Sequence, residues 1–409
     1  LSIFSSAVSP EDISLTRYDY VRSRSERLCA PLSAEDHVPQ PVSDVSPPKW
    51  HLAHTTWFFE TFVLAKQQPD YRLFHPLYGY LFNSYYESEG AHLARPQRGS
   101  LSRPTVAEVM AYRAHVDESM RRMLKEPLEP AVAALVELGM QHEQQHQELL
   151  ITDIKYILGH NPLHPAYDPL GIGPQDVTAE HDGTCPPLDD WLSVEGQTIR
   201  MGHQGPGFAF DNESPSHLAL IQGVDIRVAL VTNDEYLQFM RDGGYQRHSL
   251  WHAEGWDWVQ TLKFRAPMYW QPDPNQPDGW GHYTLQGVMP LTSQAPVTHV
   301  SYYEAHAFCD WAGWRLPTEF EWEAAASRFD WGRRWEWTRS AYQPYPGFAR
   351  SEGAVGEYNG KFMVNQQVLR GASWATSPGH ARLTYRNFFH APLRWQFTGI
   401  RPVRSRESA

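Results

Sequence analysis

The stretch MQHEQQHQELL, residues Met140–Leu150, lies in a segment whose apolar residues recur at helical spacing. His142 and His146 are four residues apart, so on a helix they lie one above the other on the same face. Leu138 and Leu149 share that face, which makes it apolar. A buried imidazole needs a polar partner, and a metal ion is one such partner. Two core histidines hydrogen-bonded to carboxylates are the alternative that the spacing alone leaves open.

Composition and charge narrow the class of protein. The chain has 409 residues, 41% hydrophobic and 20% charged, which is typical of a globular protein with more than one domain. Its net charge of −12 without a basic run argues against nucleic acid as the main partner. No apolar run reaches the length of a membrane span and no signal-peptide pattern is present, so we expect a cytoplasmic protein. The widely spaced Cys29, Cys185 and Cys309 predict neither a disulfide framework nor a zinc cluster.

The first 160 residues predict a bundle of four helices, over 9–28, 48–60, 105–125 and 130–159. The first begins at Ser9–Asp12, where a serine cap precedes a proline and two acids. Thr105 and Glu108 form a capping box at the start of the third. Bundles of this kind build metal sites in their cores from side chains on facing helices.

The composition of the sequence and the length of its predicted elements change after this bundle. Prolines and glycines are frequent between 161 and 190, which indicates a linker. Beyond it, short strands are expected at Thr198–Met201 and Leu218–Ile221, and short helices at Asn233–Arg241 and Tyr303–Ala312. The predicted class is therefore α+β, with a helical bundle over 1–160, a linker over 161–190 and a domain with little regular structure over 191–409.

Two further histidines lie on the second predicted helix. His51 and His54 are three residues apart and can face the same direction. One of them would complete a three-histidine site with His142 and His146, which leaves coordination positions open and so marks a catalytic site. We favour His54, because it lies one turn deeper in the helix, and expect His51 beside the site or at a cap. Imidazole suits zinc and iron alike, so this pattern does not select the metal.

The loop over 68–102 carries candidate catalytic and substrate-binding groups. Tyr85 and Tyr86 are adjacent in it, and a phenol near a metal can donate a proton to a developing anion. Arg95 and Arg98 follow, and an arginine fork can bind a substrate carboxylate through two hydrogen bonds. Packing tyrosines and solvated arginines are the plainer alternatives.

Several segments of the second half are distinctive, but none contains a pattern typical of a metal site, a nucleophile or a phosphate-binding loop. They are NESPSH (Asn212–His217), VTNDEY (Val231–Tyr236), RLPTEFEWE (Arg315–Glu323), LRGASW (Leu369–Trp374) and GIRPV (Gly399–Val403). Their arginines, carboxylates and tryptophans indicate ion pairs and packing that hold a loop-rich fold together. These segments resemble the formylglycine-generating-enzyme-like (sulfatase-modifying-factor) domain, a C-type-lectin-like fold. The cysteine-pair chemistry of that family is not expected here, because Cys309 is the only cysteine after the linker.

The helical half resembles DinB-like metal-binding bundles through LAH (Leu52–His54) and its HxxxH pair. A DinB-like bundle followed by this lectin-like domain is the layout of the ergothioneine-biosynthesis sulfoxide synthases, and the resemblance spans nearly the whole chain. It implies a mononuclear non-haem Fe(II) site with His54, His142 and His146 as ligands. It also implies a reaction in which O2 is used to join a thiol sulfur to C2 of the hercynine (Nα-trimethylhistidine) imidazole, with oxidation of the sulfur to a sulfoxide.

The resemblance further assigns residues to the imidazole substrate. Gln145 matches a position that contacts the imidazole. Asn387 and Phe388 match a pair that lines the trimethylammonium end, where an aromatic face attracts a quaternary ammonium group. Phe389, the next residue, is expected to contact substrate as well.

The thiol donor is the point on which members of this family differ. Members that use γ-glutamylcysteine carry an acid and an arginine where this chain has Phe389 and Leu393, so the resemblance favours free cysteine. Tyr85 and Tyr86 resemble the loop that supplies the proton donor in the cysteine-using branch. The family usually has a longer insertion after Asp330 than this sequence has.

Four alternatives remain open at this point. The donor could be γ-glutamylcysteine, or the product could be the 5-histidylcysteine sulfoxide of ovothiol-type enzymes, although no methyltransferase domain is recognisable. A DinB-like thiol S-transferase would use zinc and need no O2. A non-catalytic binding module would not need three inward histidines. The oligomeric state is not predicted.

Overall fold

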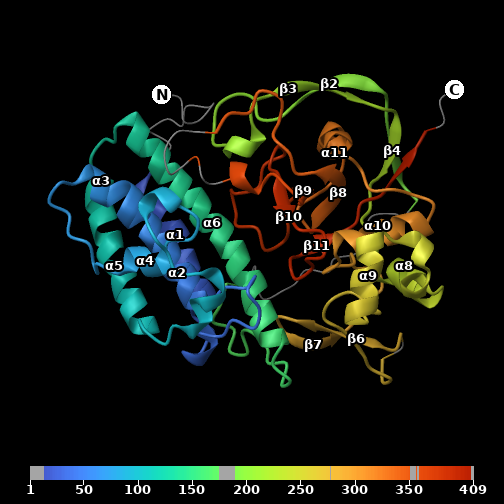
Figure 1. The fold of residues 1–409 in the computed structure, drawn as a ribbon, viewed down its shortest axis with the longest axis horizontal. Helices are drawn as coiled ribbons and strands as arrows, with labels where there is room; N and C mark the ends of the chain where they lie inside the picture. Colours follow the sequence, from blue (N-terminus) through green and yellow to red (C-terminus); the bar gives the residue numbers. More distant parts are fainter. Residues whose placement is uncertain (1–12, 175–188, 277, 351–355, 357–358, 407–409) are drawn as a thin grey trace.

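Long helices dominate the N-terminal half of the chain (Figure 1). The computed structural model describes residues 13–174, 189–276, 278–350, 356 and 359–406. The helices are α1 (Leu15–Cys29), α2 (Pro48–Phe58), α5 (Val106–Met123) and α6 (Pro130–Gly159). They match the four predicted helices in order. The helix start expected at Ser9–Asp12 lies outside the described residues, as does Cys185.

Local capping chemistry sets where these helices begin. The Ser14 side chain accepts a hydrogen bond, 3.1 Å long, from the backbone N–H three residues further along. Thr105 and Glu108 form the predicted capping box. Pro48 and Pro130 occupy first helical positions, where a missing N–H breaks no hydrogen bond of the helix.

Helix α2 continues past its last α-helical turn. It becomes a π-helix over Phe59–Leu64 and then α3 (Ala65–Gln67). Within the π-helical stretch the buried Glu60 accepts hydrogen bonds from the hydroxyls of Tyr71 (3.0 Å) and Tyr112 (2.6 Å), which fixes the following loop to α5. Shorter elements of this half are α4 (Tyr78–Phe82) and 3-10 turns at Glu35–His37, Glu87–Glu89 and Arg95–Ser100.

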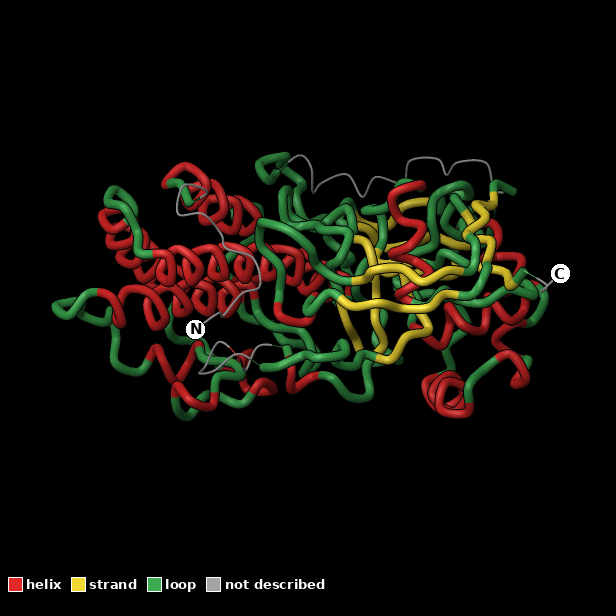
Figure 2. Tube along the Cα trace, turned by 90° about the horizontal axis from the view of Figure 1, so that it is seen from above, coloured by secondary structure: helices red, strands yellow, loops and turns green. Residues whose placement is uncertain are grey.

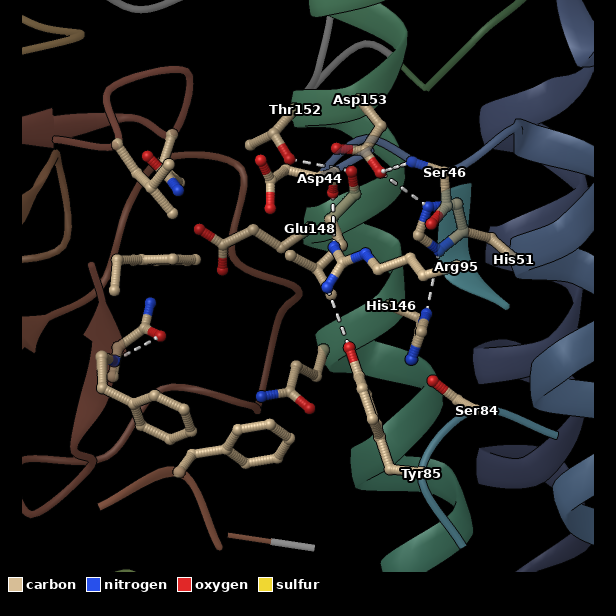
Figure 3. A pocket seen from close by; sticks show the side chains of 18 of the residues that line it. Asp44, Ser46, His51, Ser84, Tyr85, Arg95, His146, Glu148, Thr152 and Asp153 are labelled. Carbon is tan, nitrogen blue, oxygen red and sulfur yellow. Dashed lines mark hydrogen bonds and ion pairs between the residues drawn. The ribbon is translucent and has the colours of Figure 1, made fainter. Parts of the chain in front are cut away.

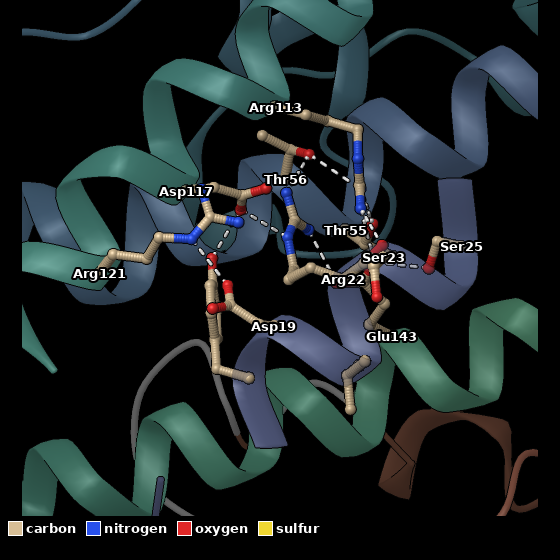
Figure 4. A network of polar contacts seen from close by, with 12 residues as sticks. Asp19, Arg22, Ser23, Ser25, Thr55, Thr56, Arg113, Asp117, Arg121 and Glu143 are labelled. Atoms are coloured by element: carbon tan, nitrogen blue, oxygen red, sulfur yellow. Dashed lines mark hydrogen bonds and ion pairs between the residues drawn. The ribbon is translucent and has the colours of Figure 1, made fainter. Parts of the chain in front are cut away.

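A buried network of ion pairs joins the long helices (Figure 4). Glu143 of α6 accepts hydrogen bonds from Arg22 (2.7 Å) and Arg113 (3.0 Å). The hydroxyl of Ser25 donates a third to it at 2.6 Å. Arg22 also donates to Asp117 of α5 at 2.7 Å, so each guanidinium has a carboxylate partner away from water. The network ties α1, α5 and α6 together.

Short strands and helices follow from Trp191 onward, at the other end of the molecule (Figures 1 and 2). One sheet has the order β1 (Trp191–Val194), β4 (Val224–Arg227), β12 (Val403–Ser405), and another the order β10 (Asn387–Phe389), β9 (Gln367–Gly371), β8 (Trp335–Ala341), β11 (Thr398–Gly399). A hairpin pairs β2 (Gln197–Met201) with β3 (His217–Ile221), and a third sheet joins β5 (Trp270–Pro272), β6 (Trp280–Thr284) and β7 (Gly287–Pro290). Neighbours run antiparallel except β11 and β8.

The helices of this region are short. They are α8 (Asn233–Arg241), α9 (Ala253–Leu262), α10 (Tyr302–Trp311) and α11 (Glu319–Ala325). The sequence predicts α8 and α10 but not α9 or α11. Helix α11 begins within RLPTEFEWE and ends two residues beyond it, and its roughly two turns are too few for a helical period to show.

Ion pairs in which at least one partner belongs to a distinctive segment hold this region together, as the sequence predicts. The bidentate pairs are Arg315–Glu321 (2.8 and 2.8 Å), Arg386–Glu319 (2.8 and 2.9 Å) and Arg401–Glu336 (2.6 and 2.8 Å). A large cluster of buried apolar side chains runs from the helical half into this region, and a smaller one also joins the two halves. The structure therefore confirms the α+β class, with a helical half followed by a half that contains the strands. Within the described part of the chain, no helix combines the length and apolarity needed to cross a membrane.

The Glu143 network generates a stability prediction. Replacing Glu143 by Leu leaves two buried guanidiniums short of a carboxylate, and we expect unfolding free energy to fall by about 3–5 kcal/mol. Urea unfolding followed by circular dichroism measures the loss. Asp19→Asn is the matched control, since it breaks the exposed ion pair with Arg121 and should cost less than about 1 kcal/mol. Equal losses in the two variants would contradict a special role for the buried network.

Candidate metal centre

Three histidines from two helices converge in the core of the helical half. His54 comes from α2, and His142 and His146 come from successive turns of α6. One ring nitrogen of each lies within 4.8 Å of the others, and they are the only such cluster of three or more potential ligands among the described residues. His54 and His142 are buried, and His146 is half-buried because it borders a cavity. These are the three residues that the sequence proposes as ligands.

Hydrogen bonds behind two of these rings fix which nitrogen faces the centre. His54 donates from Nδ1 to the backbone carbonyl of Phe82 at 2.6 Å, which leaves Nε2 as its ligand atom. His146 Nδ1 lies 2.9 Å from His51 Nδ1, and His51 Nε2 lies 2.9 Å from an Asp153 carboxylate oxygen (Figure 3). If His51 donates to Asp153, it accepts from His146, and His146 also presents Nε2 to the centre. Outer hydrogen bonds of this kind orient metal-bound histidines.

The environment keeps the three imidazoles neutral. Burial lowers the pKa of His142 to about 3, and it also lowers the pKa values of His54 and His146 well below their ordinary value, with a further contribution from the neighbouring histidines. Trp50 and Trp57 stack on the two sides of His54, with ring centroids 4.5 and 5.7 Å away. Neutral, oriented imidazoles are the form that binds a divalent transition metal, so the donor set fits one.

A cavity of about 290 Å³ opens from the histidines and is lined by both halves of the chain. Every residue that the sequence proposes for the site lines it: His54, His142, His146, Tyr85, Tyr86, Arg95, Arg98, Gln145, Asn387, Phe388 and Phe389. The structure thus brings together residues from α2, α6, the loop of the helical half and β10. The cavity has two chemically different walls.

One wall is cationic and comes from the helical half. Arg98 is buried, donates to the hydroxyls of Ser46 and Ser84 at 2.9 Å each, and lies over the Trp50 ring at 3.5 Å. Burial lowers the pKa of its guanidinium to about 9, so it stays charged at neutral pH. It forms no ion pair with a carboxylate of the described residues. A buried charge of this kind needs an anion, which a ligand carboxylate would supply.

Arg95 and Asp44 extend this wall. Arg95 donates to the Tyr85 hydroxyl at 2.9 Å and to the backbone carbonyl of Asp44 (Figure 3). The Asp44 carboxylate lines the cavity without a hydrogen bond or ion pair to another described side chain. A positive and a negative group therefore lie close together beside the histidines. Such a pair complements the carboxylate and ammonium groups of an amino acid.

The two tyrosines occupy different surroundings in the same loop. Tyr85 is half-buried and bonded to Arg95, as described above. Tyr86 is buried against Trp57 and Phe62, with ring centroids 5.6 and 5.0 Å away. The side chain of Asn83 bonds both backbone groups of Tyr86, accepting from its N–H at 3.2 Å and donating to its carbonyl at 3.0 Å. Both phenols border the cavity.

The opposite wall is aromatic and comes mainly from the second half. Phe388 stacks on Tyr342 with ring centroids 4.0 Å apart and an interplanar angle of 9°. Gln145 of α6 donates to the hydroxyl of Tyr385 at 3.1 Å, which aims its amide along this wall. The side-chain oxygen of Asn387 accepts a hydrogen bond, 2.9 Å long, from the backbone N–H of Phe388.

Glu148 bridges the two halves at the edge of the cavity. Its carboxylate accepts hydrogen bonds from Trp335 (2.6 Å), Ser373 (2.6 Å) and Thr376 (2.7 Å), all from the second half. Burial raises its pKa, while these donors act against that rise. The sequence alone does not predict that Glu148 and Asp44 border the cavity, or that His51 contacts Asp153. Only Asp153 leaves a signal, because it lies seven residues after His146 on the same helical face.

Comparison with known proteins agrees with this architecture. Residues 17–150 match the DinB superfamily, and residues 177–334 match the sulfatase-modifying factor enzyme 1-like domain. The hercynine oxygenase of Mycolicibacterium smegmatis is 29% identical, covering 87% of this chain and 90% of the relative, and that of Mycobacterium tuberculosis is 28% identical with the same coverage. These matches support the expected sulfoxide-synthase family. The names of these two relatives, which say that they act on hercynine, support an oxidoreductase.

Other matches concern the second half alone. The formylglycine-generating enzyme of Thermomonospora curvata is 31% identical over 167 residues, which cover 34% of this chain and 52% of that enzyme. Among solved structures, PvdO from Pseudomonas aeruginosa aligns over 56% of this chain and all of its own, with 14% identity. Its TM-score is 0.32, which is too low to establish a shared fold. The two family matches confirm the predicted DinB-like bundle and the formylglycine-generating-enzyme-like region that follows it.

The hydrogen bonds behind His146 generate a prediction about metal affinity. In Asp153→Asn the acceptor that orients His51 is weakened, and we expect Fe(II) affinity to fall about 10–100-fold. Anaerobic competition against a chelator measures the affinity. Thr152→Val is the control, because Thr152 also lines the cavity but its hydroxyl bonds only the Leu149 carbonyl of its own helix. Unchanged affinity in Asp153→Asn would show that this contact does not support the metal.

Proposed function

We propose that this protein is an Fe(II)- and O2-dependent sulfoxide synthase that joins the sulfur of cysteine to C2 of the hercynine imidazole. The observation that carries the proposal is the cavity in which a three-histidine cluster lies between a cationic wall and an aromatic wall. Forming the C–S bond removes two electrons, and oxidising the sulfur removes two more. One O2 accepts all four electrons, with one oxygen atom entering the sulfoxide and the other leaving as water.

The metal would be held by Nε2 of His54 and Nε2 of His146, together with a ring nitrogen of His142. When bound, it would supply the site at which both substrates and O2 are brought together and oxygen is activated. The protein's own contribution is positioning, which can be worth about 7–11 kcal/mol of the barrier in favourable cases. Three protein ligands leave coordination positions for substrates, as a reaction of three components requires.

Hercynine fits the wall that carries Gln145 and Phe388. Its trimethylammonium group cannot donate a hydrogen bond, so an aromatic face is the favourable contact for it. Phe388, which stacks on the buried Tyr342, offers such a face, with Asn387 beside it. The Gln145 amide, three residues after His142 and next to His146, is placed to hydrogen-bond an imidazole at the histidine cluster.

Free cysteine fits the opposite wall. Arg98 and Arg95 would bind its carboxylate, and Asp44 would pair with its ammonium group, which exists only when the nitrogen is not acylated. Where a glutamyl group would need polar partners, the cavity has Phe389 and Leu393. These features together favour cysteine over γ-glutamylcysteine as the donor.

The phenols of Tyr85 and Tyr86 are the proposed proton donors. A proton delivered from Oη to the oxygen atom that leaves as water favours formation of the sulfoxide over simple oxidation of the thiol. Tyr86 is the first choice because it is buried against Trp57, which stacks on His54. Tyr85 is the second choice because its hydroxyl already accepts a hydrogen bond from Arg95.

The test of the proposed function is product analysis. The protein is loaded with Fe(II) without oxygen and then given hercynine and air, with cysteine in one reaction and γ-glutamylcysteine in the other. We expect the cysteine adduct sulfoxide, substituted at C2, and at least tenfold less product from γ-glutamylcysteine. Product at C5, turnover without O2, or a preference for γ-glutamylcysteine would each contradict the corresponding part of the proposal.

A second prediction separates the roles of the two tyrosines. Tyr86→Phe removes the proposed proton donor, so formation of the C–S adduct should slow on the order of 10²-fold while cysteine sulfinate accumulates. Tyr85→Phe should change the ratio of these products less. Mass spectrometry of both products under air gives the ratio. If neither variant raises the share of sulfinate, the tyrosines do not supply this proton.

A further inference from the structure

Lys361 reaches the tyrosine loop from the second half of the chain. It lies in a 3-10 turn, Gly360–Phe362, and its Nζ donates a hydrogen bond to the backbone carbonyl of Tyr85. The same ammonium group lies 5.4 Å from the ring centroid of Tyr85 and 5.8 Å from that of Phe362. These two rings meet edge to face, with centroids 5.2 Å apart and an interplanar angle of 82°. Lys361 therefore forms both a charge-assisted hydrogen bond and cation–π contacts.

The carbonyl that Lys361 holds belongs to the peptide unit between Tyr85 and Tyr86. The N–H of that same unit donates to the Asn83 side chain at 3.2 Å. A peptide unit is planar, so holding its oxygen from one side and its N–H from the other fixes the orientation of the whole plane. That plane sets the backbone dihedrals on either side of it, and with them the directions of both tyrosine side chains.

The clasp formed by Lys361 and Phe362 also contacts the wall proposed for hercynine. Phe362 lies beside Phe388, with ring centroids 6.0 Å apart and an interplanar angle of 27°. Both phenylalanines line the cavity. A single short turn of the second half thus contacts the aromatic wall on one side and the tyrosine loop on the other.

We infer that Lys361 is a positioning residue that aims the tyrosine pair at the reacting atoms and so determines which product forms. This inference rests on the proposed function, because it concerns the proton that the phenols deliver. Its effect is on the fate of the oxygen and the sulfur, since Lys361 holds backbone and rings rather than the proposed carboxylate, ammonium or trimethylammonium partners. Loss of the ammonium group frees the peptide plane and lets the phenols turn away.

The test compares three variants of the full-length, iron-loaded protein. Lys361→Met keeps the length of the side chain without its charge, and Lys361→Arg keeps a cationic donor. Lys66→Met is the matched control, because Lys66 forms an exposed ion pair with Glu89 of the same loop without touching either tyrosine. Under air, the ratio of cysteine sulfinate to sulfoxide adduct should rise about fivefold in Lys361→Met. KM values for hercynine and cysteine should stay within twofold, the arginine variant should regain most of the wild-type ratio, and the control should match wild type.

A second measurement needs no turnover. Amide hydrogen exchange of the iron-loaded protein without oxygen reports on the segment 83–90, where we expect exchange to speed up about fivefold in Lys361→Met and to be unchanged in Lys66→Met. An unchanged product ratio in Lys361→Met, or a change in KM alone, would overturn the positioning role. Unchanged exchange would overturn the clasp itself. If the wild-type protein forms no C–S product with either thiol, the proposed function fails, while the exchange measurement still decides whether the clasp exists.

Discussion

The burial of Glu143 between two arginines is the interaction on which the site depends. Glu143 and His142 are consecutive on α6, and consecutive helical residues point about 100° apart, so one faces the ion-pair network and the other faces the histidine cluster. The network fixes the rotation of α6 against α1 and α5. Because His142 and His146 are carried by the same helix, that rotation also sets where their rings lie relative to His54.

The two walls of the cavity suit ligand groups of opposite charge. The helical half provides uncharged imidazoles together with Arg98, which is charged at neutral pH and forms no ion pair with a described carboxylate. The second half provides the aromatic face of Phe388 and the neutral amide of Asn387, and an aromatic face suits a cation that makes no hydrogen bonds. Because the cationic wall and the aromatic wall come from separate halves, each can be shielded from water without bringing a bound cation next to Arg98.

The sequence predicts the parts of this protein that rest on local periodicity. The long helices, the inward face of α6 and the position of His142 and His146 on that face follow from spacing, because a helix converts sequence separation into direction. The choice of His54 as the third histidine rests on its depth in the helix and on family resemblance. Contacts between distant segments leave no such trace. Asp44 borders the cavity only because the loop before α2 returns to it, and Trp335 meets Glu148 only after the second half folds against α6. The roles of Asn387 and Phe388 come from family resemblance, since neither residue stands out by spacing or charge.

The hydrogen bonds of Glu148 have a consequence for how such proteins can evolve. The Glu148 carboxylate of one half accepts hydrogen bonds from Trp335, Ser373 and Thr376 of the other. Exchanging either half for that of a distant relative would leave these buried donors, or the buried carboxylate, without hydrogen-bond partners. Recombination at the junction is therefore selected against unless both sides of this contact travel together. New substrate preferences are more accessible through point changes on the cavity walls, such as at Phe389 and Leu393, than through shuffling of whole domains.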